Sequence, residues 1–175
     1  PPPEAAGWKL VAHNDLGMHC MDSDYSIFSI LPPFNNVYAQ LIDPSGNLVT
    51  SPSGFVVTYE GVADPTGSIN TTSAGKTAFW TWSPVLYGGS PVVNKGLAGH
   101  DMPGAGNPPQ AMTFDPAQGA WVAQGIPITP TDDAGHRRTY PLMKIVARDL
   151  AGNVLAATTP VLPVSTEMDC RACHA

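Results

Sequence analysis

Short runs of apolar residues, each bounded by Gly, Pro, Asn or Asp, recur along most of the chain. Runs of this length that are rich in β-branched and aromatic residues are typical of β-strands. The run AFWTWSPV alternates large apolar residues with small or polar ones, as a strand with one buried face does. No apolar pattern with helical periodicity extends over a useful length. The pattern predicts strands at residues 36–43, 47–51, 54–61, 77–86, 119–129, 140–149 and 153–164.

Two segments, residues 39–50 and 144–157, share a strand, the sequence Asp-x-x-Gly-Asn and a second strand. The side chains of Asp43 and Asp149 can close a turn, and the glycine three residues after each can adopt the left-handed conformation. Each segment is therefore predicted to be a β-hairpin. Seven short strands with such turns predict an all-β fold, an antiparallel immunoglobulin-like β-sandwich with long loops.

The composition limits the classes of function that are open. Of 175 residues, 43% are hydrophobic and 13% are charged, which favours a folded domain with an unusually uncharged surface. The net charge of −6 argues against a nucleic-acid partner, which would require a basic face. No apolar run approaches the roughly 20 residues that a membrane-spanning helix needs.

The chain carries a CxxCH sequence at Cys170, Cys173 and His174. Two thiols at this spacing can add to the two vinyl groups of a haem, and the adjacent histidine can then bind the iron as an axial ligand. A covalent link lets a short segment hold a haem with little pocket of its own. The motif predicts a c-type haem.

Three other uses of the same residues compete with haem attachment. A structural zinc site usually needs a second Cys or His pair at similar spacing, and no second CxxC exists. A thioredoxin-like redox pair lies at a helix start in a βαβ unit, which the strand pattern does not predict. A disulfide between Cys170 and Cys173 would close a loop too small to stabilise the fold much.

Sulfur and imidazole side chains gather near the start of the chain and suit copper or haem iron better than magnesium or calcium. A haem held by His174 needs a sixth ligand, and we expect His19 to supply it. A methionine in that position would raise the redox potential. His136 lies in a polar turn, and we expect no metal role for it. The other candidate second ligands or separate metal ligands are His13, His100, Met18, Met21, Met102 and Cys20.

A second hypothesis uses the same residues for a mononuclear copper or zinc site, with His13, His19, Cys20 and His100 as ligands and the haem as its electron relay. Blue-copper proteins are β-sandwiches with two histidines and a cysteine as ligands. Their cysteine comes late in the chain, whereas Cys20 comes early, so a blue-copper centre does not fit. A non-blue copper site or a zinc site stays open.

Residues 170–174 resemble the haem-binding signature of c-type cytochromes. The stretch HNDLGMHCMD, followed by YSIFSILPPFN, is similar to stretches of large multihaem cytochrome c proteins from metal-respiring bacteria. The resemblance implies an exported electron carrier, periplasmic or extracellular, that exchanges electrons with other haems or cytochromes in the same chain or in neighbouring subunits. It is compatible with a homo-oligomer or filament.

The expected organisation is a lead-in at residues 1–7, a β-sandwich domain at 8–164 and a haem-attachment segment at 165–175 that continues into a longer haem region. Two loops, residues 13–35 and 94–110, have a length that is usually functional or disordered. The chain has no Gly-x-Ser-x-Gly elbow or phosphate-binding loop. The acidic pair Asp132–Asp133 and the tryptophans of FWTW have ordinary structural explanations, so we expect an electron carrier rather than an enzyme.

Overall fold

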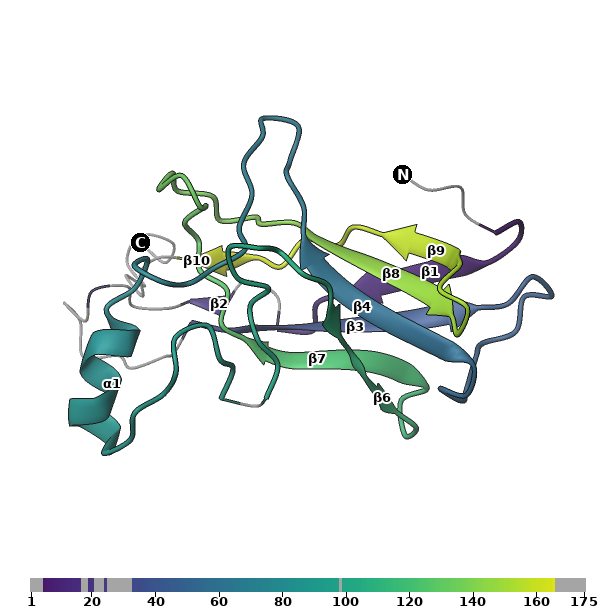
Figure 1. The fold of residues 1–175 in the computed structure, drawn as a ribbon, viewed down its shortest axis with the longest axis horizontal. Helices are drawn as coiled ribbons and strands as arrows, with labels where there is room; N and C mark the ends of the chain where they lie inside the picture. The colour runs from purple at the N-terminus through teal and green to yellow at the C-terminus, as the bar shows by residue number, and fades with distance from the viewer. Residues whose placement is uncertain (1–4, 17–18, 21–23, 25–32, 98, 166–175) are drawn as a thin grey trace, which may run out of the picture.

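Two four-stranded antiparallel sheets form the centre of the molecule (Figure 1). The computed structural model describes residues 5–16, the backbone of 19–20, residue 24, and residues 33–97 and 99–165. The predicted all-β character is confirmed, and α1 (Phe79–Tyr87) is the one helix among these residues. The first sheet has the order β1 (Lys9–His13), β3 (Asn35–Ile42), β7 (Ala120–Ile126), β6 (Thr113–Asp115). The second has the order β5 (Gln110–Ala111), β4 (Phe55–Gly61), β8 (Met143–Asp149), β9 (Val154–Thr158).

Both sheets contribute to one hydrophobic core. Alternate residues of the central strands point inward, and Val37 and Leu41 of β3 and Tyr59 of β4 are almost fully buried. Phe55 of β4 packs edge-on against Trp121 of β7, with ring centroids 6.5 Å apart. Each large apolar side chain buried in this way stabilises the fold by roughly 1.5–3 kcal/mol. The core therefore holds the sheets face to face and gives the loops at their ends a rigid base.

The strand predicted at residues 77–86 is wrong, because this segment contains α1. The N-cap residue is Ala78, which has no side-chain capping bond, and the hydroxyl of Thr77 before it accepts a hydrogen bond from the backbone N–H of Phe79 at 3.1 Å. Gly88, with a φ of 70°, ends it in the left-handed conformation. Only Phe79 and the serine four residues later are buried, so the aromatic alternation does not mark the face of a strand.

The Asp-x-x-Gly-Asn turns form as predicted. Asp43 and Asp149 each accept a hydrogen bond from the backbone N–H four residues later at 2.8 Å, and Gly152 has a φ of 89°. The hairpin of β8 and β9 is confirmed. The predicted strand 47–51 is wrong, because after the first turn the chain makes only a single bridge, from Leu48 to Ile42, before it leaves the sheet.

The predicted strand 153–164 is interrupted. β9 ends at Thr158, and the next strand, β10 (Val164–Ser165), belongs to a separate two-stranded parallel sheet with β2 (His19–Cys20). Pro160 and Pro163 lie between them and have no N–H to continue a ladder. The edge strands β1 and β6 were not predicted, since both are short and contain few consecutive apolar residues.

Candidate functional site

A network of amide side chains closes the loop that carries the predicted iron ligands. The loop leaves β1 at His13 and enters β3 at Asn35. The Nδ2 of Asn14 donates hydrogen bonds to Oδ1 of Asn35 and, at 3.1 Å, to the carbonyl oxygen of Asn36. The Asn35 side chain is fully buried, and its Nδ2 donates to the carbonyl oxygen of Pro163 at 2.8 Å. Hydrogen bonds therefore join the two ends of the loop to each other and to Pro163, the residue before β10.

The parallel pair of β2 and β10 brings two predicted parts of the site together. His19 is in register with Val164, and Cys20 with Ser165. Cys170 follows Ser165 by five residues, which span at most ~17 Å even when fully extended. The backbone that carries the expected second ligand thus lies beside the strand that leads into the CxxCH motif, although about 145 residues separate Cys20 from Ser165 along the chain.

Several of the predicted ligands lie outside the described residues. They are Cys170, Cys173, His174, Met18 and Met21, together with the side chains of His19 and Cys20. Their roles stay predictions.

His13 ends β1 at the start of the ligand loop and has an exposed side chain. Its imidazole stacks on the ring of Tyr38 from the neighbouring strand, with centroids 5.6 Å apart and an angle of 17° between the ring planes. Stacking holds the ring in place by its face and leaves the edge with the two nitrogens open to other partners. The geometry is compatible with the predicted role as a ligand.

His100 is held by both ring nitrogens. The backbone N–H of Gln124 donates to Nδ1 at 3.1 Å, and Nε2 lies 3.3 Å from the hydroxyl of Thr113. An amide N–H can only donate, so Nδ1 is the acceptor and the neutral ring carries its proton on Nε2. Burial is the main reason that the pKa of His100 lies below its usual value. In this conformation the ring has no free lone pair, so binding a metal would break its bond to Gln124.

The Gly/Pro-rich loop around His100 is anchored to the sheets at several points. The side-chain oxygen of Asn94 accepts hydrogen bonds from the backbone N–H and the hydroxyl of Ser73, at 2.7 and 2.8 Å. Met102, the candidate beside His100, is buried in the core. A Cβ at Gly96 would lie 1.9 Å from the carbonyl oxygen of His100, so only glycine fits there. The predicted long loop is thus a fixed part of the fold.

No three His, Cys, Asp or Glu side chains come together as a metal site within the part of the chain that the structure describes. The side chains of His19 and Cys20 fall outside that part. The predicted copper or zinc site at His13, His19, Cys20 and His100 therefore stays a prediction. His136 lies in an exposed turn, where its Nδ1 is 3.2 Å from Oδ2 of Asp132.

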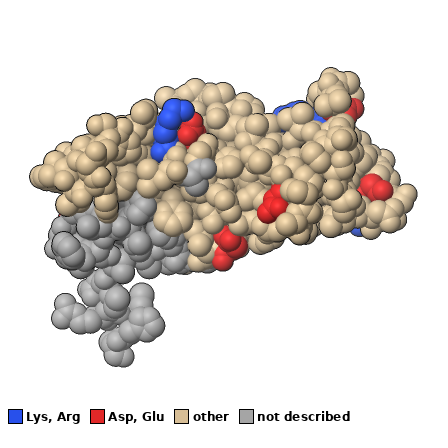
Figure 2. Space-filling view, turned by 90° about the horizontal axis from the view of Figure 1, so that it is seen from below, with Lys and Arg blue, Asp and Glu red and all other residues tan. Residues whose placement is uncertain are grey.

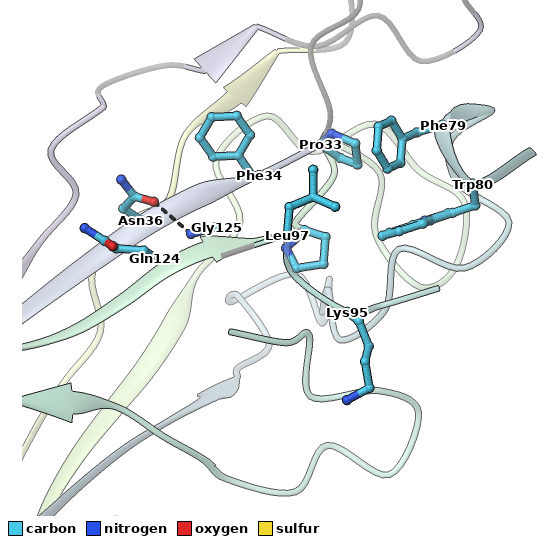
Figure 3. A pocket seen from close by; sticks show the side chains of 10 residues that line it. Pro33, Phe34, Asn36, Phe79, Trp80, Lys95, Leu97, Gln124 and Gly125 are labelled. Atoms are coloured by element: carbon cyan, nitrogen blue, oxygen red, sulfur yellow. Dashed lines mark hydrogen bonds between the residues drawn. The ribbon is translucent and has the colours of Figure 1, made fainter. Parts of the chain in front are cut away.

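Beside the amide network lies an apolar hollow of about 290 Å³ that the sequence did not predict (Figure 3). Its walls come from the start of β3, the start of α1, the loop before His100 and the end of β7. The only hint along the sequence is that residues 77–94 contain no Asp, Glu, Lys or Arg. Its apolar lining residues are Pro33, Phe34, Phe79, Trp80, Leu97 and Pro127, and Asn36, Lys95, Gln124 and Gly125 complete the lining.

Comparison with family models, curated protein sequences and solved structures finds no match to this chain. Among the described residues, no helix has the length and apolar character that crossing a membrane requires. Function is therefore inferred from the chain's own residues and from how the fold arranges them.

Proposed function

We propose that this chain is an electron-transfer protein that carries a c-type haem on the CxxCH motif at residues 170–174. The observation that carries the proposal is the pairing of β2 with β10, which sets the backbone of His19 beside the strand that leads into the motif. The buried amide of Asn35 supports this arrangement, because it links the ligand loop to Pro163. The segment with the second iron ligand and the segment that leads into the attachment motif would then belong to the same two-stranded sheet.

The chain's own residues would have distinct tasks. The thiols of Cys170 and Cys173 would each add across a haem vinyl group, with sulfur bonding to one carbon and the hydrogen going to the other. His174 and, as we propose, His19 would both bind the iron. The bound haem would supply the one-electron redox chemistry. Two histidine ligands on a rigid base require little rearrangement on electron transfer.

We also propose that the two sheets are an immunoglobulin-like sandwich that holds this haem at a set distance from others. The order β1-β3-β7-β6 corresponds to strands A-B-E-D of a constant-type immunoglobulin domain, and β4-β8-β9 corresponds to C-F-G. The partners would be other haems or cytochromes, in the same chain or in neighbouring subunits, and the location would be the periplasm or the cell exterior. Homo-oligomers or filaments fit this role.

A pyridine haemochrome assay on the full chain, expressed with a c-type maturation system, tests the proposal. We expect a c-type spectrum at one haem per chain, which is lost when Cys170 and Cys173 are both replaced by serine. His19→Ala should convert the low-spin spectrum to a high-spin one, whereas His136→Ala should not. If His19→Ala carries haem c but keeps the low-spin spectrum, His19 is not the ligand. A colourless protein would refute the function, and copper or zinc bound besides iron would favour the mononuclear metal site.

A further inference from the structure

We infer that the apolar hollow beside α1 receives one edge of the haem carried by residues 170–174, an inference that rests on the proposed function. The hollow is about 290 Å³, just below the ~300–1,000 Å³ range of ligand pockets. It is therefore large enough for part of a porphyrin and too small for all of it. A haem held mainly by covalent links needs a partial wall of this kind.

The hollow lies within reach of the attachment motif. Phe34 and Asn36 line it, and the residue between them, Asn35, donates its side-chain hydrogen bond to Pro163 at 2.8 Å. From Pro163 to Cys170 the chain has seven residues, which can extend up to ~25 Å. The motif can thus deliver a haem to this wall without any change in the two sheets.

The lining has the chemistry that a porphyrin edge prefers. Phe34, Phe79, Trp80 and Leu97 face the hollow from three segments of the chain, as Figure 3 shows. Aromatic and aliphatic side chains bind flat apolar groups and exclude water, which sets the redox potential of a haem. Lys95, the charged residue among the described lining residues, forms an ion pair with Asp101 at 2.8 Å. On the face seen in Figure 2, the described residues at the tip of the α1 end show no charged side chains.

Two buried polar atoms at this wall lack a hydrogen-bond partner among the described residues, Nε1 of Trp80 and Oγ of Ser83. A buried donor without an acceptor is costly and rare in folded proteins. Trp80 lines the hollow, and Ser83 lines a second hollow of about 510 Å³ that shares Phe79 and Leu97 with the first. A haem has two propionate carboxylates, so it brings hydrogen-bond acceptors together with an apolar edge. Both atoms are closed to solvent, so an acceptor in the hollow reaches them only when the side chain of Trp80 or Ser83 turns toward it.

Placing a positive or a negative charge at Leu97 tests the inference without disturbing the core, because this side chain is 68% exposed. We would compare Leu97→Lys and Leu97→Asp in the holoprotein by redox titration at low ionic strength. A cation near the haem edge favours the reduced iron and an anion the oxidised iron. At a fixed ambient potential, we expect the ratio of reduced to oxidised haem to rise about tenfold for Lys and to fall about tenfold for Asp. Tenfold corresponds to ~59 mV for a one-electron couple.

The same pair of substitutions at Leu150 is the matched control. Leu150 is 75% exposed and lies in the β8–β9 turn, at the other end of the molecule from α1 (Figure 1). We expect Leu150→Lys and Leu150→Asp to leave the redox potential of the haem unchanged. A second variant, Trp80→Phe, keeps the aromatic ring and removes the N–H, and we expect it to change the Soret circular dichroism.

Equal potentials for the Lys and Asp variants at Leu97, in a protein that carries its haem c, would overturn the hollow as the haem wall and leave the proposed function intact. A change in oligomeric state without a change in potential would overturn it in favour of a second copy of the chain as the occupant. Absence of haem c in the haemochrome assay would overturn the proposed function and this inference with it.

Discussion

Asp132 is a single side chain that holds together a turn and a distant loop. Its carboxylate accepts hydrogen bonds from the hydroxyl of Ser68 and from the backbone N–H of His136, both at 2.8 Å, and it is 2% exposed. Burial by itself would raise the pKa of this carboxyl. The hydrogen bonds from His136 and Ser68 outweigh that effect and lower the pKa to about 2.

Replacing this carboxylate should change how stability depends on pH. Unfolded aspartate titrates near pH ~3.9, so Asp132 stabilises the fold above that pH, and its contribution is lost as the pH falls toward 2. We expect Asp132→Asn to lower the free energy of unfolding by about 1–3 kcal/mol at neutral pH. Urea unfolding at a series of pH values should show the gap to the wild type narrowing below about pH 4.

Asp15→Asn is the control for this prediction. It removes the same charge from an exposed position, and it keeps the side-chain oxygen that accepts from Asn36 at 3.2 Å. Its unfolding curve should stay close to that of the wild type. Parallel pH dependences for the wild type and Asp132→Asn would contradict the role given to this carboxylate.

Local chemistry at the residue scale was only partly visible in the sequence. The turns at Asp43 and Asp149 were predicted because Asp-x-x-Gly-Asn specifies both an accepting side chain and a left-handed glycine. Asp64 and Asp132 form the same turn with a serine or a histidine in place of the asparagine. These two turns were missed because the bond that all four turns share comes from the backbone N–H of the last residue, which a serine or a histidine supplies as well as an asparagine. Burial of Asp132 depends on packing from a distant loop, which no local pattern encodes.

At the scale of elements, α1 depends on its ends more than on its interior. It contains Pro84, which cannot donate a backbone hydrogen bond, and four of its last six side chains are apolar and exposed, namely Trp82, Val85, Leu86 and Tyr87. The hydroxyl of Thr77 is the side chain that accepts from the first turn. An isolated nine-residue helix is unstable in water, so its cap and its packing must hold it.

We therefore expect Thr77→Ala to lower the free energy of unfolding by about 1 kcal/mol, as the loss of one hydrogen bond does. Thr77→Ser keeps the acceptor oxygen and should stay near the wild type. Thr81→Ala changes an exposed threonine of the same helix and should have little effect. Chemical denaturation of the three variants measures these differences. An equal loss for the alanine and serine variants at position 77 would show that the hydroxyl does not stabilise the start of the helix.

Element prediction succeeded where one face of a strand enters the core. The predicted ranges 36–43, 54–61 and 119–129 match β3, β4 and β7 to within three residues at each end. It failed for α1, because aromatic residues in alternation resemble a strand when Thr77 before the helix and Gly88 after it are not considered. The CxxCH motif could be found from spacing alone. The hollow beside α1 could not, since its walls come from four segments that meet only in the folded chain.

At the scale of the whole molecule, Asn35 joins three regions that are far apart in the sequence. Asn35 is the first residue of β3. Its side chain accepts a hydrogen bond from Asn14, at the start of the ligand loop, and donates one to the carbonyl oxygen of Pro163, just before β10. The backbone N–H of Val164 donates in turn to the carbonyl oxygen of Thr139 at 2.9 Å. The strand that leads into the CxxCH motif is thus attached to the fold on two sides, and one of these depends on a single buried amide.

Asn35→Ala should therefore release this strand before the rest of the fold opens. The substitution removes the side-chain donor to the carbonyl oxygen of Pro163 and leaves Nδ2 of Asn14 with the carbonyl oxygen of Asn36 as its remaining acceptor. A buried group left without its partner costs about 1–3 kcal/mol. We expect faster hydrogen exchange at Val164 and faster proteolysis of the chain after Pro163 than in the wild type. Asn153→Ala, which removes an exposed turn amide, should change the β8–β9 turn only. If β10 exchanges at the wild-type rate in the first variant, the amide of Asn35 does not couple the ligand loop to the attachment segment, and the main structural support for a haem at this end of the molecule is lost.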